Sequence, residues 1–224
     1  MYLSWKKLTI DNFSNENINA LYAGGHLFTR KHLGSMYQTR SLRIDLSKFE
    51  LSSENRRILK KTENLKLETC NLPLENYTWR IGKMGKDFYE TKFGLKTFSA
   101  NKIKELLTAR HNFNKLFLYQ IENCKLKIEN LQCGYAICRE TNELLHYSYP
   151  FYNLQSEISN LGMGMMTLAI QHAKNVGKKY IYLGSAQRPT DTYKLQFTGL
   201  EWWDGKVWQT DLEELKQQIK QSKQ

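Results

Sequence analysis

Two glycines in the C-terminal third, Gly162 and Gly164, stand where an apolar segment with helical spacing begins. Because glycine has no side chain, backbone N–H groups in the first turn of a helix can approach an anion closely, and the helix dipole favours negative charge there. The spacing therefore predicts a helix start that binds an anionic ligand. A close contact between this helix and a neighbouring strand would also require glycine and is the alternative.

Basic residues in the first third of the chain form a second candidate site. Nine lysines and arginines but only three acidic residues lie between positions 30 and 61, and the whole chain has a formal net charge of +11. A helix capped by Ser52 or Ser53 brings residues four apart onto one face. Two such pairs share a face here, Arg56 with Lys60 and Arg57 with Lys61. Phosphates would neutralise their mutual repulsion, so we interpret the face as an RNA contact, with a solvated basic helix as the alternative.

Length and composition bound the architecture. A chain of 224 residues with 41% hydrophobic content can bury the core of one large domain or two small ones. No apolar run reaches the ~18–20 residues that a transmembrane helix needs, and residues 1–7 lack the apolar core of a secretory signal. We expect a cytoplasmic protein that does not bind membranes. Its predicted parts are a basic region, residues 1–70, and a larger domain, residues 71–224.

The cysteines lack the spacing of a metal site, since none of them forms a CxxC pair. We expect buried, reduced thiols at Cys70, Cys124, Cys133 and Cys138.

The apolar pattern predicts a mixture of strands and helices. Alternation over residues 41–46 predicts a half-buried strand, and residues 71–86, which contain Pro73, are interpreted as a connection. A helix capped by Ser99 is expected to run to about residue 110. Strands are predicted at 116–120, 131–138 and 143–149, the last two as a hairpin, and the Gly162 helix should end at Gly177 before a strand at 180–184.

The order of strand, strand, glycine-led helix and strand is that of the core of the GNAT acyltransferase fold. We therefore predict an α+β protein with a GNAT-like mixed sheet flanked by helices and a small basic N-terminal region. Acyl-CoA enzymes of this class carry Q/R-x-x-G-x-G/A at the pyrophosphate site. Ser159 stands here in place of the usual Gln or Arg.

The basic region and the C-terminal third together resemble the arginyl- and leucyl-tRNA–protein transferases of the N-degron pathway. In that family a Q-x-R element precedes a strand and an S-x-x-x-R-R-x-L-K helix, as residues 38–40 precede 41–46 and 52–60 here. Further matching segments are 25–30, Tyr149–Phe151, Leu161–Gly162, Tyr182–Gly184 and Tyr193–Phe197, with Trp208 near the closing segment. The resemblance covers roughly residues 20–215.

One departure from the family concerns cysteine. Relatives commonly carry a cysteine-rich stretch just before the Q-x-R element, whereas residues 33–37 contain none. We therefore expect no iron–sulfur or zinc site and no cofactor.

The resemblance implies aminolysis of an ester, in which an N-terminal α-amino group attacks the aminoacyl carbonyl and the 3′-terminal ribose hydroxyl leaves. Asp191, Gln187 and Gln196 are the candidates for removing or relaying the proton of the amine. Lys194, expected on a final strand and mostly solvated, is the candidate for contacting the oxyanion or the terminal adenosine phosphate.

The same resemblance, with the two sites above, implies which residues contact the substrates. They are Arg40, Arg43, Arg56, Arg57, Lys60, Lys61, Tyr149, Gly162, Gly164, Gly184 and Tyr193. The expected reaction moves an amino acid, with arginine favoured over leucine, from aminoacyl-tRNA to the free and acidic N-terminus of a protein or peptide acceptor, which marks it for degradation. The alternatives are a CoA-dependent N-acyltransferase and a non-catalytic RNA-binding module.

Overall fold

A computed structural model of the chain describes residues 3–121 and 132–221. The chain divides into two compact units, each built from separate stretches of sequence. The first unit comprises Met1–Ser52, Glu140–His146 and His172–Gln224, and the second comprises Ser53–Arg139 and Tyr147–Gln171. The predicted boundary at residue 70 falls within a strand of the second unit. No helix in the described part of the chain is long and apolar enough to span a membrane.

The strands and helices form a mixed α+β architecture, as predicted. Eight strands follow the order β11-β10-β4-β9-β8-β7-β6-β5, and a further three follow the order β1-β3-β2. Strand β8 (Leu144–Tyr152) belongs to both units, since its first three residues lie in the first and the rest in the second. The registers of β4 with β9 and of β5 with β6 are antiparallel, whereas β8 and β9 are parallel, so the larger sheet is mixed.

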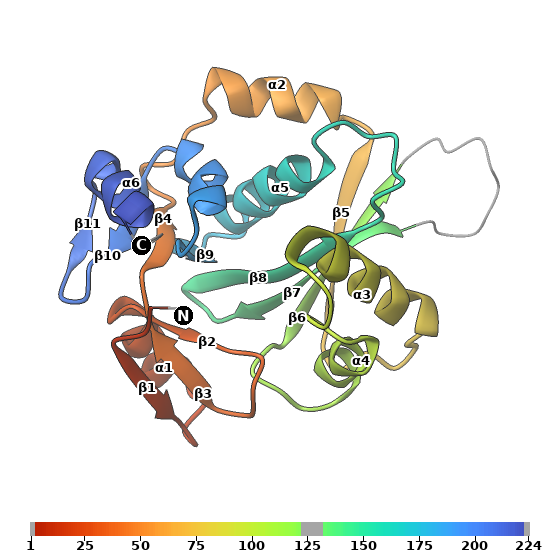
Figure 1. The fold of residues 1–224 in the computed structure, drawn as a ribbon, viewed down its shortest axis with the longest axis horizontal. Helices are drawn as coiled ribbons and strands as arrows, with labels where there is room; N and C mark the ends of the chain where they lie inside the picture. The colour runs from red at the N-terminus through yellow and green to blue at the C-terminus, as the bar shows by residue number, and fades with distance from the viewer. Residues whose placement is uncertain (1–2, 122–131, 222–224) are drawn as a thin grey trace. The chain divides into compact units, whose positions relative to one another are not determined.

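The first unit contains the small sheet and the strands that lead to the candidate site. In it α1 lies against the small sheet (Figure 1). Its elements are β1 (Lys6–Thr9), α1 (Asn15–Ala23), β2 (His26–Phe28), β3 (Ser35–Gln38), β4 (Ser41–Asp45), β9 (Tyr180–Ser185), η1 (Pro189–Gln196), β10 (Leu200–Trp203), β11 (Trp208–Gln209) and α6 (Leu212–Gln221).

Strand β4 is where predicted, but it is not half-buried. It lies between β10 and β9, so that Ile44 pairs with Leu200 on one side and with Ile181 on the other. Residues on both faces of β4 from Ser41 to Ile44 are buried. The buried polar side chains Ser41 and Arg43 form polar interactions. Ser41 Oγ donates a hydrogen bond to Gly25 O at 2.7 Å, and Arg43 pairs with a carboxylate that is described below.

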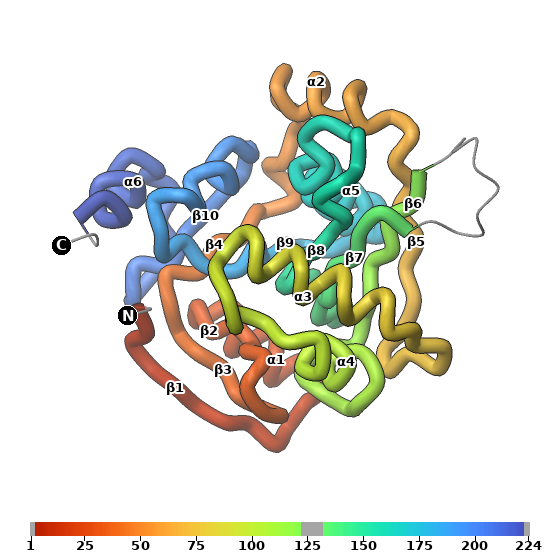
Figure 2. Tube along the Cα trace, turned by 45° about the vertical axis from the view of Figure 1, so that its right-hand side comes forward, coloured from red at the N-terminus to blue at the C-terminus, as the bar shows by residue number. Residues whose placement is uncertain are grey.

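The second unit carries most of the helices. Its elements are α2 (Ser53–Lys61), β5 (Leu65–Asn71), α3 (Trp79–Phe93), α4 (Ala100–Thr108), β6 (Lys115–Ile121), most of β7 (Gln132–Glu140), the rest of β8 and most of α5 (Leu161–Asn175). Helices α3 and α4 lie side by side (Figure 2).

Several local predictions are confirmed in this unit, and one is wrong. The Ser99 hydroxyl accepts a hydrogen bond from Lys102 N and begins α4, and α2 begins at Ser53. Residues 71–86 are not wholly a connection, because α3 begins at Trp79 and includes both glycines of that stretch. A Cβ on Gly85 would lie 2.4 Å from Ile103 Cδ1, so this glycine serves close helix packing and not a turn.

Three of the four cysteines lie in the described residues, and all three are free thiols, as predicted. Burial raises the pKa of the Cys133 thiol to about 11, and Cys138 is also buried. Cys70 is only partly buried, and Cys124 lies outside the described residues.

Candidate active site at the end of strand β9

The carboxyl end of β9 gathers several of the predicted catalytic residues within the first unit. The parallel register joins Leu144–His146 of β8 to Tyr180–Tyr182 of β9. β9 then reaches Gly184, whose φ of +77° suits glycine, and ends at Ser185. In α/β sheets, ligands bind outside the carboxyl ends of parallel strands. This strand end is therefore the natural place for a site.

The segment that follows β9 is helical and not the predicted final strand. Residues Pro189–Gln196 form the 3₁₀ helix η1, which brings Asp191 and Lys194 back toward the strand end. Pro189 suits the first helical position because its fixed φ is already helical and the missing N–H has no partner to lose there.

Lys194 is largely buried, which contradicts the expectation of a solvated lysine. Its side chain keeps 12% of its exposure, and Nζ donates to Ser185 O at 3.0 Å. Desolvation lowers the pKa of the Lys194 ammonium, the Asp191 carboxylate at 3.9 Å opposes the shift, and Arg188 adds to it. The lysine thus presents a poorly solvated positive charge.

Arg40 supplies a second buried cation at the same strand end. The residue is 6% exposed, and its Nη1 lies 3.5 Å from Ala186 O, the carbonyl after the one that Lys194 contacts. Within the described residues, Arg40 makes no ion pair and its Nε has no hydrogen-bond partner. Burial lowers its pKa. A buried guanidinium without a carboxylate is costly, so this arrangement favours an anionic ligand.

His146, to which the sequence analysis assigned no role, lies near Lys194. It is buried, and its Nδ1 is 2.9 Å from the Tyr22 hydroxyl. Burial, together with the positive charge of Lys194, lowers the pKa of His146 to about 3. The imidazole is therefore neutral at pH 7.

Asp191 and Gln187 are held by contacts with the main chain. Asp191 Oδ2 accepts hydrogen bonds from the backbone N–H groups of Gln187 and Arg188, both at 2.9 Å. The Gln187 amide pairs with Leu3, accepting from its N at 2.9 Å and donating to its O at 3.3 Å, and Nε2 also donates to Thr39 Oγ1. Through these contacts Gln187 joins the turn after β9 to residues 3 and 39.

Gln196 and Tyr193 are the other two predicted site residues in η1. Gln196 Nε2 donates to Tyr193 O at 2.8 Å. Tyr193 is 44% exposed, and its ring centroid is 5.7 Å from Lys194 Nζ. Tyr193 is thus the most accessible of the predicted residues around Lys194.

Arg43 is bound to a carboxylate, although a phosphate contact was expected of it. Its Nε and Nη2 donate to Glu201 Oε2 at 2.8 and 2.7 Å. The guanidinium also lies between two rings, 4.1 Å from the centroid of Tyr180 and 3.9 Å from that of Trp208. Arg43 is therefore much less available to a phosphate than an exposed arginine.

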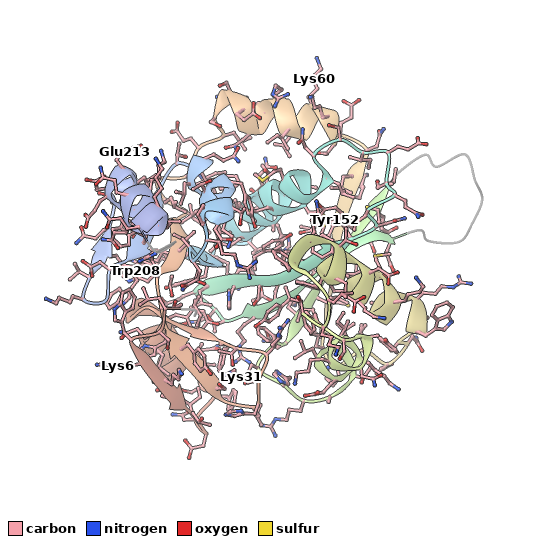
Figure 3. The ribbon with its side chains drawn as sticks, in the orientation of Figure 1. Lys6, Lys31, Lys60, Tyr152, Trp208 and Glu213 are labelled. Atoms are coloured by element: carbon pink, nitrogen blue, oxygen red, sulfur yellow. The ribbon has the colours of Figure 1, made fainter. Side chains whose placement is uncertain are left out.

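The basic face of α2 lies in the second unit. Arg56, Lys60 and Lys61 are exposed, and Lys60 points away from the helix (Figure 3). Arg57 instead makes two hydrogen bonds to the Glu54 carboxylate, at 2.6 and 2.5 Å. Of the four predicted cations, Arg57 is the one for which the described residues provide an ion pair.

The glycines of α5 make close packing contacts in the second unit. A Cβ on Gly162 would lie 2.9 Å from Tyr152 Cε1, and one on Gly164 would lie 2.6 Å from Thr62 Cγ2. The N–H of Gly164 donates to Asn160 O. These contacts support the alternative interpretation, in which the glycines allow close packing and do not bind an anion.

The aromatic residue expected at the substrate, Tyr149, also packs. Its ring lies edge-on to those of Phe98 and Phe113, with centroids 5.7 and 5.3 Å away.

Comparisons with known proteins do not assign a family. No family model matches the chain, and no curated protein matches it. Among solved structures it is similar to L-PGS from Bacillus licheniformis, with 12% identity and a TM-score of 0.48 over 76% of this chain and 51% of that one. It is also similar to FemX, with 11% identity and a TM-score of 0.47 over 80% and 61%. A further similarity is to the GCN5-related glucosamine N-acetyltransferase region of a fungal GH3 β-N-acetylglucosaminidase, with 10% identity and a TM-score of 0.49 over 88% and 23%.

The chain spans less than two thirds of each of these structures, and about half of the L-PGS chain. At such identities and TM-scores the similarities determine neither the donor nor the acceptor of a reaction.

Proposed function

We propose that this chain is an acyltransferase with a GNAT-like fold that moves an aminoacyl group from a charged tRNA to an amino group. The observation that carries the proposal is the pair of buried cations, Lys194 and Arg40, at the carboxyl end of β9. In acyl transfer from an aminoacyl-tRNA, positive charge stabilises two negative groups. One is the phosphodiester of the 3′-terminal nucleotide, and the other is the oxyanion that forms at the reacting carbonyl.

Charge also favours an RNA donor. The net charge of +11 and the exposed cations Arg56, Lys60 and Lys61 suit a large polyanion better than a small acyl thioester. Coenzyme A, the donor in the alternative reaction, has few phosphates and does not require a basic surface of this extent.

In the proposed reaction the attacking amine forms a bond to the ester carbonyl carbon, and the tetrahedral intermediate expels the ribose hydroxyl. The amine loses a proton, and the leaving oxygen gains one. An ordinary α-amino group has a pKa of about 7.7–8.0, so only modest help from a base is needed near neutral pH. We assign this help to Asp191, and oxyanion or phosphate stabilisation to Lys194.

The choice of donor amino acid and of acceptor follows the resemblance to the tRNA–protein transferases. Arginine is the favoured donor amino acid, leucine is possible, and the acceptor is a protein N-terminus with an acidic first residue. The resemblance of residues 38–61 and 149–197 to the tRNA–protein transferases supports this choice.

The decisive experiment measures transfer of radiolabelled amino acid from total charged tRNA to peptides that begin with Asp, Glu or Ala. We expect transfer that ribonuclease pretreatment abolishes. A parallel reaction contains acetyl-CoA and the same peptides. Acetyl transfer without any use of charged tRNA would replace the proposal by the N-acyltransferase alternative.

A further inference from the structure

The first unit contains a pocket at the opposite end of β9 from Lys194. Its volume is about 270 Å³. The residues that matter here are Arg43, Glu143, Lys179, Tyr180, Tyr182 and Trp208. The lining residues Tyr180 and Tyr182 lie five and three residues before Ser185 on β9, so the pocket begins about 10 Å along the strand from the candidate active site and extends to about 17 Å. It is therefore a separate site.

Aromatic rings form the walls of this pocket. Trp208, which is marked in Figure 3, is held in place because its Nε1 donates to Ala23 O at 2.7 Å. Its ring and that of Tyr180 enclose the Arg43 guanidinium, and Tyr182 lies edge-on to Trp208 with centroids 5.9 Å apart. These contacts hold the rings in place, with the Arg43 guanidinium between Tyr180 and Trp208, so little ordering of the wall is needed when a planar ligand binds.

The rim carries one acceptor and one donor. Glu143 and Lys179 are exposed, and Lys179 Nζ lies 5.4 Å from the centroid of the Tyr180 ring. Their positions are fixed by the backbone, because Lys179 N donates to Glu143 O at 2.7 Å. A carboxylate accepts hydrogen bonds from amino and imino groups, and an ammonium donates to carbonyl or phosphate oxygens.

This combination matches the needs of an unpaired nucleobase. Single-stranded RNA is recognised by stacking bases on aromatic rings and by hydrogen bonds to the base edge, with nearby cations contacting phosphate. The volume is slightly below the 300–1,000 Å³ typical of drug-sized ligand pockets, which suits one planar ring system.

We propose that the pocket lined by Tyr180, Tyr182 and Trp208, with Glu143 and Lys179 at its rim, binds a single unpaired base of RNA. The inference rests on the proposed RNA donor. In that case the protein would hold the RNA at two places in the first unit, at the anion site at one end of β9 and at this pocket at the other.

The test uses free nucleotides, so that it needs neither charged tRNA nor catalysis. AMP, GMP, CMP and UMP are titrated onto the full chain and followed by saturation-transfer NMR, with ribose 5-phosphate as the ligand without a base. We expect saturation of base protons with at least one nucleotide and no comparable binding of ribose 5-phosphate. Equal binding of ribose 5-phosphate would overturn the proposal, because only a phosphate would then be recognised. Failure of all four nucleotides to bind would overturn it as well.

Variants locate the binding. Glu143→Gln combined with Lys179→Gln changes only exposed side chains, and we expect it to weaken nucleotide binding at least tenfold, as for the loss of contacts to charged groups. Lys206→Gln, an exposed lysine that does not line the pocket, is the matched control and should bind as the parent does. Trp208→Leu should weaken binding further. Unchanged binding in the Glu143/Lys179 variant would show that the base binds elsewhere and would refute the assignment.

The transfer assay separates this inference from the proposed function. If nucleotides bind in a way that depends on Glu143 and Lys179 but no aminoacyl transfer is detected, the base-binding pocket is supported and the proposed reaction is refuted. If aminoacyl transfer from charged tRNA is detected but nucleotides do not bind at the pocket, the proposed reaction is supported and the base-binding pocket is refuted.

Discussion

Lys194 Nζ lies 3.9 Å from Asp191 Oδ1, while the other oxygen of the same carboxylate accepts hydrogen bonds from the backbone N–H groups of Gln187 and Arg188. One carboxylate therefore both closes the turn after β9 and partly offsets a buried ammonium. The ammonium and the Arg40 guanidinium leave this strand end with an excess of positive charge. This is the local basis for the acyl-transfer proposal.

Replacement of Lys194 by Met should separate catalysis from stability. We expect aminoacyl transfer to fall by at least the ~10²-fold typical of losing one oxyanion donor. The melting temperature should stay the same or rise, because the variant no longer buries a desolvated charge. Lys206→Met, at an exposed position, is the control for the loss of a lysine. Full single-turnover rates in Lys194→Met would place the chemistry elsewhere.

Asp191→Asn should lose transfer activity in a way that depends on pH. If the carboxylate removes the amine proton, activity should recover in alkaline solution, where the amine is already deprotonated. The variant should also lose stability by about 1–3 kcal/mol, since two backbone N–H groups lose a charged acceptor. A loss of activity that is equal at all pH values would restrict Asp191 to holding the turn.

His146 should make folding sensitive to acid. Its pKa is about 3 in the folded chain and 6.5 ordinarily, so between these values the unfolded chain binds a proton that the folded chain does not. The free energy of unfolding should therefore fall as the pH drops from 6.5 toward 3, by several kcal/mol at about 1.4 kcal/mol per pKa unit. Urea unfolding at pH 7 and pH 4.5 measures this change. His146→Gln should show a smaller decrease, and an equal decrease would contradict the prediction.

The exposed cations of α2 should control how tRNA binding depends on salt. Replacing Arg56, Lys60 and Lys61 with Gln should weaken binding and reduce the slope of log K against log salt by up to roughly 0.7–0.9 for each lost phosphate contact. Arg57→Gln should have a smaller effect, because Glu54 already neutralises that guanidinium. An unchanged slope in a folded triple variant would make this face a solvated surface.

Variants of Gly164 can distinguish a role of this glycine in helix packing from a role in binding an anionic ligand. Gly164→Ala should destabilise the protein by about 1–3 kcal/mol, because the new Cβ would lie 2.6 Å from Thr62 Cγ2. Thr62 Oγ1 would lie 2.7 Å from the same Cβ, so adding Thr62→Ala, which removes both γ atoms, should restore part of the stability. If activity returns together with stability, the glycine serves packing. Activity that stays low in the stable double variant would indicate that an anionic ligand approaches the backbone there.

Local sequence patterns predicted eight elements of this protein, β4, β6, β7, β8, β9, α2, α4 and α5. The serine cap of α4, the glycine that ends α5 and the basic face of α2 depend on residues within a few positions of one another, so backbone and capping preferences are enough to predict them. The strands around β9 follow from runs of apolar residues. The sequence also placed Asp191, Lys194, Gln187 and Gly184 near one strand end, because they are close in the chain.

Long-range contacts decided the character of the site. Whether a lysine is solvated or buried depends on what packs over it, and neither the burial of Lys194 nor that of Arg40 can be read from neighbouring residues. Arg43 became an ion-pair partner because Glu201, 158 positions away, lies on the adjacent strand. The pocket at Trp208 likewise comes from tertiary contacts, whereas the helical form of Pro189–Gln196 has local support, from Pro189 and the Asp191 carboxylate, that the sequence analysis missed. Desolvation and charge pairing act through space, so only the folded chain shows which of its many basic residues carry an unbalanced charge.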